Sequence, residues 1–320
     1  METRRTFLKK STMAAAAVSV PAAPGCVTIS TIRAKVPMNT GKTENAAVLW
    51  YSQTGYTERD GRLLAKTLEK HGTTVTASDL RDFDKSRIGD YDLIVMGSPV
   101  FYYDTPSYVK DWIRSLPDLK GTPVASYVTF GGPEGNQHNA ACSILEGLSE
   151  KQGVPIALNA FRNMSSYPLA WSEENVNDNV WRARHLPDRE TYERVRKYAG
   201  YIINQVKQGR SDEFTQKLTW REFATFFGLI WWNKQLISNH SIIEDQCIGC
   251  GTCVEKCPVD AIDLDHYTVD TTSCVLCFGC INNCPARAVN MEYNGKKVIG
   301  YKQFMKLRHV EVMEPDELKT

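Results

Sequence analysis

Short apolar runs alternate with amphipathic stretches through residues 45–208. The first run, Ala46–Tyr51, carries no charged or amide side chain, which predicts a strand buried on both faces of a parallel sheet. The stretch after it ends near Gly72 and is predicted to be a helix. Its apolar residues fall on one helical face: Leu63, Leu64 and Leu68.

The same alternation continues along this part of the chain. It predicts strands at 73–77, 92–96, 123–130 and 156–161, and helices at 107–116, around Ile144 and at 189–208. Strands that alternate with helices in this way predict an α/β doubly wound parallel sheet of five strands. Ligands of such sheets bind beyond the carboxyl ends of the strands.

Three loops of unusual composition follow predicted strands at that edge. The first is rich in hydroxyl groups, and its backbone N–H groups would face an anion at the start of a helix. It lacks the Lys of a nucleoside triphosphate loop, so it favours a single phosphate monoester, although an ordinary Ser/Thr helix cap is the alternative. The loops are Ser52–Thr57, Gly97–Tyr103 and Phe130–Asn136.

These loops carry a resemblance: residues 45–208 are similar to a flavodoxin. The first loop matches the T/S-x-T-G-x-T pattern, the second the Gly-x-Pro-x-aromatic-Tyr loop, and the third is Gly-rich. The resemblance implies FMN, with aromatic side chains against the flavin ring, although those aromatics could instead be core residues. The implied cofactor-binding residues are Ser52, Gln53, Thr54, Gly55, Tyr56, Thr57, Ser98, Pro99, Val100, Phe101, Tyr102, Tyr103, Phe130, Gly131, Gly132 and Gly135.

Eight of the ten cysteines form a C-x2-C-x2-C-x3-C-P run that occurs twice. Three thiolates at this spacing can hold one corner of a cubane iron–sulfur cluster, and in paired runs the fourth thiolate comes from the other copy. Structural zinc and disulfides are the alternatives, but zinc knuckles lack the third Cys and the trailing Cys-Pro. One predicted cluster has Cys247, Cys250, Cys253 and Cys284 as ligands; the other has Cys274, Cys277, Cys280 and Cys257.

Residues 242–291 resemble a bacterial ferredoxin with two [4Fe-4S] clusters, which implies a small α+β domain. The chain order resembles that of the flavodoxin–ferredoxin fusion proteins called EFR1-type ferredoxins. Residues 209–241 are expected to be an aromatic helical linker, and 292–320 a C-terminal extension. The aromatic segment Phe223–Trp232 is too short to span a bilayer; it could lie in a membrane interface, receive a partner or pack between the domains.

Residues 1–26 have the layout of a twin-arginine export signal, with Arg4-Arg5 ahead of a moderately apolar stretch; an ordinary basic N-terminus is the alternative. This predicts a periplasmic or cell-envelope protein that crosses the membrane already folded around its cofactors. Gly25-Cys26 could be a lipidation site, but Ala23 and Pro24 are unusual for one. Residues 27–44 are small and polar, and we expect a linker there.

The formal net charge of +1 gives no electrostatic argument for nucleic acid or an anionic membrane. No Gly-x-Gly-x-x-Gly segment opens a helix after a strand, so NAD(P)H is not the expected donor. The expected function is electron transfer between the two clusters and FMN, with redox proteins as partners. The alternatives are an FMN-dependent reductase of a small substrate or quinone and a non-enzymatic adaptor of a membrane redox complex. A reductase would need a proton donor beside the flavin, and the candidates are Tyr102, Tyr103, His138 and Glu134.

Overall fold

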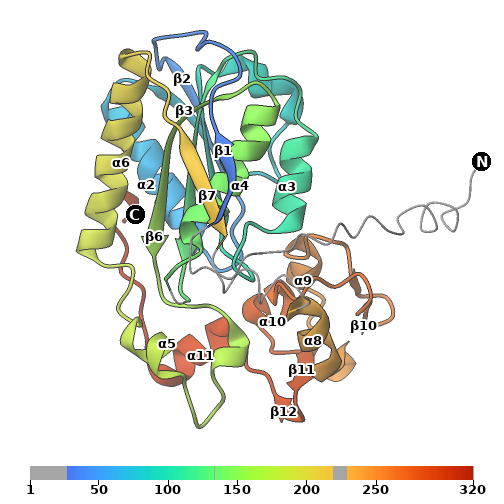
Figure 1. Cartoon of the computed structure of the whole chain (residues 1–320). Coiled ribbons are helices and arrows are strands. Elements are labelled where there is room, and N and C mark those ends of the chain that lie inside the picture. Colours follow the sequence, from blue (N-terminus) through green and yellow to red (C-terminus); the bar gives the residue numbers. More distant parts are fainter. Residues whose placement is uncertain (1–26, 133, 219–228, 320) are drawn as a thin grey trace, which may run out of the picture.

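The structure is a computed structural model that describes residues 27–132, 134–218 and 229–319. The predicted signal 1–26, including Cys26, and most of the Phe223–Trp232 segment lie outside the described residues. Two lobes are joined in one molecule, a larger one with a parallel sheet and a smaller one below it (Figure 1).

The larger lobe contains the predicted five-stranded parallel sheet, in the order β3-β2-β4-β5-β6. Counted from β2, this is the order 2-1-3-4-5 that defines the flavodoxin-like arrangement, so the predicted fold class is confirmed. The ends of the observed strands differ from the predicted ones by three residues at most: β2 Asn45–Trp50, β3 Thr74–Asp79, β4 Leu93–Pro99, β5 Pro123–Phe130 and β6 Val154–Arg162.

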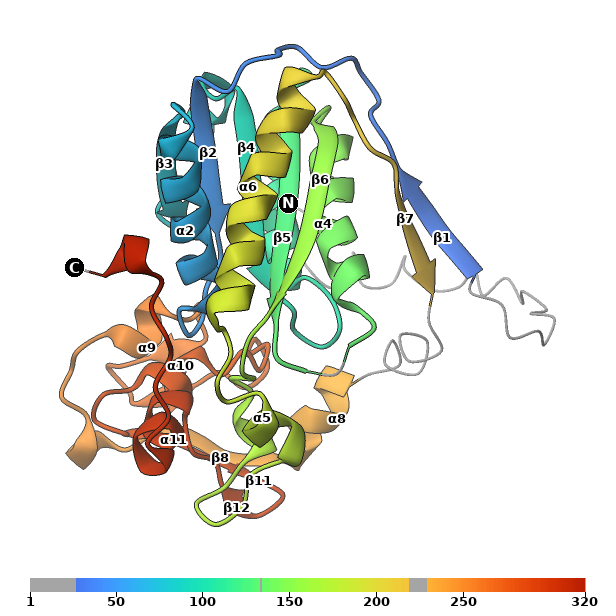
Figure 2. The ribbon, with the colours of Figure 1, turned by 90° about the vertical axis from the view of Figure 1, so that its left-hand side faces the viewer.

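Helices cover both faces of this sheet (Figure 2). α2 (Tyr56–Lys70) and α6 (Arg189–Lys207) pack on one face. α3 (Ser107–Arg114) and α4 (Gln137–Glu150) pack on the other. Because each face is covered, the central strands are buried on both sides, as their uninterrupted apolar sequences require. The short helices of this lobe are η1 Lys85–Asp90, η2 Pro168–Ala170 and α5 Asp178–Arg182.

The expected linker 27–44 is only partly a linker. Its first residues form β1 (Val27–Ile32), which pairs antiparallel with β7 (Phe214–Leu218) in a two-stranded ribbon. The ribbon lies beside α4 (Figure 2). The β1 sequence, Val-Thr-Ile-Ser-Thr-Ile, is rich in β-branched residues, which favour strands even where the mean polarity resembles that of a loop.

The smaller lobe has an antiparallel sheet in the order β12-β11-β8-β10-β9. This sheet begins earlier and ends later than the expected 242–291, because most of β8 and all of β12 lie outside that range. The expected helical linker 209–241 contains β7 and part of β8, and α8 is the helix described within it. The elements are α8 Leu229–Leu236, β8 Ile237–Ile242, η3 Glu244–Gln246, α9 Thr252–Glu255, β9 Ile262–Asp263, β10 Thr268–Val269, α10 Gly279–Asn283, β11 Val289–Tyr293 and β12 Lys296–Lys297.

The C-terminal extension packs against both lobes. In α11 (Tyr301–Arg308), the ring of Phe304 stacks on Trp171 of the larger lobe with centroids 4.4 Å apart. Beyond α11 the chain returns along α2 and α6 to η4 (Asp316–Leu318), where Glu317 accepts two hydrogen bonds from Arg196. The end of the chain therefore fastens the two lobes together.

Candidate functional site

A cavity of about 290 Å³ lies at the carboxyl ends of β2, β4 and β5. Of the predicted cofactor-binding residues, Gly55, Ser98 and Gly135 do not line it. The predicted residues that do are Ser52, Gln53, Thr54, Tyr56, Thr57, Pro99, Val100, Phe101, Tyr102, Tyr103, Phe130, Gly131 and Gly132. The three predicted loops thus meet at one place, as the topology of a doubly wound sheet requires.

The hydroxyl-rich turn after β2 is shaped as an anion cradle. Gly55 has φ 93°, in the left-handed region, and its N–H donates to the Ser52 hydroxyl 3.2 Å away. α2 begins at Tyr56, directly after Gly55. Because Gly55 has no side chain, it cannot cap the N–H groups of the first helical turn. Those N–H groups and the positive end of the helix dipole are therefore available to a phosphate.

Three buried side chains of the cavity each have a polar atom without a partner: Gln53 Oε1, Asn136 Nδ2 and Asn163 Oδ1. Each residue is less than a tenth exposed. Buried polar atoms are normally hydrogen-bonded, so an unpaired set around a cavity fits a ligand that offers both donors and acceptors. The edge of a flavin ring offers both, and the chemistry of this cavity therefore fits FMN.

Several lining residues were not predicted from the sequence. Thr129, Gln137 and the segment after β6 add hydroxyl and amide groups, and Thr129 shares a 2.8 Å hydrogen bond with Thr57. The polar segment after β6 ends a strand at the same edge, a signal that could have been used. No local signal predicts the remaining wall, which comes from the smaller lobe: Asn233, Leu276, Cys277 and Phe278.

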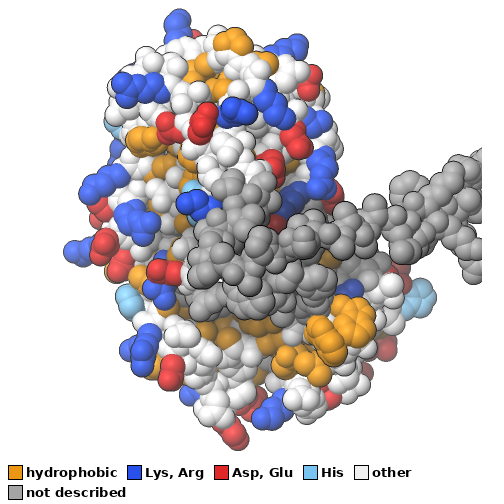
Figure 3. All heavy atoms as spheres, viewed as in Figure 1, with side chains coloured by type: hydrophobic (Ala, Val, Ile, Leu, Met, Phe, Trp, Pro, Cys, Tyr) orange, Lys and Arg blue, Asp and Glu red, His pale blue; other side chains and the backbone are white. Residues whose placement is uncertain are grey.

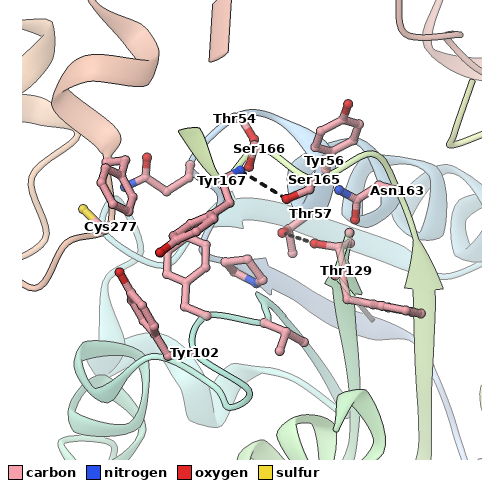
Figure 4. A pocket seen from close by; sticks show the side chains of 18 of the residues that line it. Thr54, Tyr56, Thr57, Tyr102, Thr129, Asn163, Ser165, Ser166, Tyr167 and Cys277 are labelled. Atoms are coloured by element: carbon pink, nitrogen blue, oxygen red, sulfur yellow. Dashed lines mark hydrogen bonds between the residues drawn. The ribbon is translucent and has the colours of Figure 1, made fainter. Parts of the chain in front are cut away.

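The loop after β4 connects the two lobes at the cavity (Figure 4). Tyr102 has φ 48°, and its hydroxyl donates to the Leu276 carbonyl oxygen at 3.2 Å. The Tyr167 ring lies between Tyr102 and Phe278, with centroid distances of 6.2 and 5.4 Å. Burial raises the pKa of Tyr102 and raises that of Tyr167 to about 12, so both phenols stay protonated near neutral pH.

The eight motif cysteines surround two small cavities in the smaller lobe. We name the first the outer cysteine cavity; its cysteines are Cys247, Cys250, Cys253 and Cys284. We name the second the inner cysteine cavity; its cysteines are Cys257, Cys274, Cys277 and Cys280. Each set holds three cysteines of one motif and the last cysteine of the other, which is the crossed arrangement that the paired motifs predict.

Hydrogen-bond donors and apolar groups surround these sulfurs. The N–H of Ala261 donates to Cys257 Sγ and that of Ala288 to Cys284 Sγ, both at 3.2 Å. His240 lines the inner cysteine cavity with Nε2 3.6 Å from Cys280 Sγ, and burial lowers its pKa to about 4. Burial raises the pKa of the Cys277 thiol to about 12, so a thiolate there requires a metal cation beside it.

The donor set of each cysteine cavity fits an iron–sulfur cluster. All nine cysteines of the described residues are free thiols, and none forms a disulfide there. Within the same residues no three His, Cys, Asp or Glu side chains converge on a single metal ion. Thiolates spread around a cavity suit a cluster, in which each binds a different iron.

Comparison with known proteins agrees with this division. A family model described as "4Fe-4S binding domain" matches residues 240–263, so the smaller lobe carries a 4Fe-4S domain. No curated protein matches the chain. Among the described residues no helix has the length and apolar character needed to cross a membrane.

Solved structures similar to the larger lobe include flavodoxins. One from the domain Archaea is 17% identical and covers 51% of this chain and 99% of its own, with a TM-score of 0.37. Flavodoxin 1 from Bacillus cereus is 16% identical and covers 50% and 97%, with a TM-score of 0.39. Rubredoxin oxygen:oxidoreductase from Desulfovibrio gigas is 19% identical and covers 52% and 37%, with a TM-score of 0.38. Similarities this distant do not identify a ligand or an activity.

Proposed function

We propose that this protein transfers electrons between FMN and two [4Fe-4S] clusters held in the same chain, as in the EFR1-type fusion proteins that it resembles. One observation carries the proposal: Cys277 lines both the cavity that fits FMN and the inner cysteine cavity. A cluster ligand at the wall of a flavin site gives electrons a short path between the two centres.

The residues that would hold each group follow from the cavities. Ser52, Thr54 and Thr57 would hold the phosphate of FMN, while Phe101, Tyr102 and Tyr103 would face its ring. The outer and inner cysteine cavities would hold one cluster each. When bound, the clusters carry one electron each and FMN accepts one or two, so together they can link single-electron and two-electron partners.

The reductase alternative has less support. His138 and Glu134, proposed as proton donors, do not line the cavity. His138 Nε2 contacts the Thr215 carbonyl oxygen, and Glu134 pairs with Arg162. Tyr102 and Tyr103 do line the cavity, and the Tyr102 hydroxyl already donates a hydrogen bond to the Leu276 carbonyl oxygen. The smaller lobe forms part of the cavity wall. The cavity therefore suits a bound cofactor alone better than a cofactor together with a substrate.

The test is reduction within one molecule. After photochemical reduction of the clusters, we expect flavin reduction at a rate that is independent of protein concentration. Mixing chains that cannot bind clusters with chains that cannot bind FMN should abolish this fast phase, unless a stable dimer carries the path. A rate that falls in proportion to dilution would contradict the proposal and would move the adaptor function ahead.

We also propose export by the twin-arginine route and association with the cell envelope. The support is Arg4-Arg5 in the sequence, Cys26 as a lipidation candidate, and a hydrophobic group of side chains over α8 (Figure 3). Trp231 and Trp232 in that group are 57% and 61% exposed, and exposed tryptophans favour membrane interfaces. The group is also where an adaptor would bind a membrane redox complex.

Two measurements test these proposals separately. Arg4→Lys with Arg5→Lys should retain the cofactor-loaded protein in the cytoplasm, and unimpaired export would reject the signal. Trp231→Ala with Trp232→Ala should reduce co-sedimentation with lipid vesicles. The control is Trp181→Ala, which alters a 36% exposed tryptophan on α5. Equal sedimentation of the two variants would reject the interface.

A further inference from the structure

The two cysteine cavities relate differently to the cavity that fits FMN. The inner cysteine cavity shares Leu276, Cys277 and Phe278 with it. The outer cysteine cavity shares no residue with it and is lined only by residues of the smaller lobe. On a path of short steps between the flavin and the surface, the inner position is therefore the one next to the flavin.

The inner position is bounded on its flavin side by the junction between the lobes. The Nδ2 of Asn283 donates to the Gln53 carbonyl oxygen at 3.0 Å. A Cβ atom on Gly279 would overlap the side-chain amide of Gln53 and would lie 2.8 Å from the Lys256 carbonyl oxygen. A junction this tight leaves no room for another protein between Cys277 and the flavin cavity.

The outer position, in contrast, reaches the surface through apolar side chains. Cys250 is exposed. Ile248 and Val254, which flank the first motif's central cysteines, are 68% and 40% exposed. Protein interfaces typically place such apolar residues at the centre and polar residues at the rim.

The chain segments that border the outer cysteine cavity carry more exposed acidic than basic side chains, and we name these carboxylates the acidic rim. We consider the residues that lie within two sequence positions of any residue lining the outer cysteine cavity. Among them Arg287 is the Lys or Arg side chain, and Arg287 is exposed. Lys256, one position further, pairs with Glu255, and His266 pairs with Asp263. Five exposed carboxylates lie within the same two positions, and Glu255 and Asp263 are the two already paired. Among the described residues this leaves three carboxylates without an ion pair: Glu244, Asp245 and Asp265.

We propose that this face, Ile248 and Val254 with the acidic rim, is where the chain exchanges electrons with a separate redox protein that carries a positively charged docking face. The inference rests on the proposed function. The outer cluster position is the entry and exit point, and the inner one relays to the flavin. Opposite charges speed the encounter, and the apolar centre brings the outer cluster within reach of the partner's cofactor.

Each encounter moves one electron. With a ferric c-type cytochrome as the oxidant, the reduced chain loses one electron and the haem iron gains it, with no proton or group transferred. With a reduced carrier the same face serves in the opposite direction.

The test uses the full chain loaded with FMN and clusters, reduced photochemically and mixed with a basic ferric c-type cytochrome. The test variant is Asp245→Lys with Asp265→Lys, since neither residue lines a cavity. The control is Glu150→Lys with Glu213→Lys, two exposed carboxylates of the larger lobe. Cytochrome reduction is followed by stopped flow at several ionic strengths.

We expect the test variant to reduce the cytochrome about tenfold more slowly at low salt, with the difference vanishing at high salt, and the control variant to behave as the unaltered chain. Equal rates for the test variant and the unaltered chain, or equal slowing in both variants, would overturn the inference.

Flavin reduction inside each variant is recorded in parallel. If the unaltered chain fails that internal step, the proposed function fails, whereas the cytochrome rates still report on the docking face through cluster oxidation.

Discussion

The hydroxyl of Tyr102 donates a hydrogen bond to the carbonyl oxygen of Leu276, 3.2 Å away and 174 positions further along the chain. Tyr102 lies in the loop after β4 of the larger lobe, and Leu276 lies between two cysteines of the second motif. The loop expected to pack beside the flavin and the loop expected to bind a cluster are therefore held together directly.

Tyr102→Phe should lower the free energy of unfolding by about 1 kcal/mol, because a buried carbonyl loses its partner. FMN and iron contents should not change, since the aromatic ring stays in place. Denaturant unfolding checks the stability, with Tyr103→Phe as the control at the neighbouring phenol. A Tyr102→Phe variant as stable as the unaltered protein would mean that this hydrogen bond does not hold the lobes together.

The loaded protein should contain about eight irons and eight sulfides, from two clusters with four thiolates each. Cys257→Ala should damage the inner cluster although it belongs to the first motif, and Cys284→Ala the outer cluster. Iron analysis with low-temperature spectroscopy checks both, and Cys142→Ala, in α4 and away from both cavities, is the control. One or two metal ions per chain, present as zinc, would refute the cluster assignment.

Thr54→Val and Thr57→Val should each weaken FMN binding by about 1–3 kcal/mol, because a hydroxyl hydrogen bond to a charged phosphate is lost. Thr57→Val should have the larger effect, since Thr129 also loses its partner. Fluorescence titration measures the affinity, and Thr76→Val on β3, outside the cavity, should leave it unchanged. Tight binding of FAD in place of FMN would contradict the assignment of this turn as a monophosphate site.

His240→Phe should lower the reduction potential of the inner cluster. The ring with hydrogen on Nε2 donates toward Cys280 Sγ, and donors to cluster sulfurs stabilise the reduced state. Loss of a hydrogen bond of about 1 kcal/mol corresponds to a shift of about 40 mV. A potentiometric titration should show the outer cluster unchanged, and a shift in both clusters would indicate a general structural effect instead.

Asp60 makes stability depend on pH. It is buried in α2 with Oδ1 unpaired, and burial raises its pKa to about 7. Between about pH 4 and pH 7 the unfolded chain ionises this group while the folded chain keeps it protonated, so stability falls as pH rises. Asp60→Asn should remove the fall and be more stable at pH 8 than the unaltered chain by about 4 kcal/mol.

Urea unfolding at pH 5 and pH 8 measures this difference. Asp178→Asn, which alters an exposed carboxylate at the start of α5, should show no such change between the two pH values. If the advantage of Asp60→Asn were the same at both pH values, burial of the charge would not be its cause.

The sequence was sufficient for the parallel sheet, because strands buried on both faces, such as β4 and β5, leave uninterrupted apolar runs. It was also sufficient to bring three loops to one edge, since parallel strands share their carboxyl ends. The crossed grouping of Cys257 and Cys284 around the two cavities is the one expected of paired motifs of this kind.

What the sequence did not reveal depends on partners far along the chain. The sequence predicts a linker where β1 lies, because the pairing partner of β1, β7, lies beyond the whole larger lobe. Two other features are contacts between lobes. One is the part of the cavity wall formed by Asn233 and Leu276–Phe278, and the other is the packing of α11 on Trp171. Local pattern carries no information on such contacts.

The crowding at Gly279 bears on how this protein can change over time. In a free-standing ferredoxin lobe a methyl group at this position would still meet the Lys256 carbonyl oxygen of the same lobe, but nothing from a second lobe. Here that methyl group would also meet the side chain of Gln53, which belongs to the larger lobe. The halves are thus no longer interchangeable modules: a ferredoxin recruited from elsewhere would have to inherit this glycine, or the neighbouring lobe would have to evolve with it.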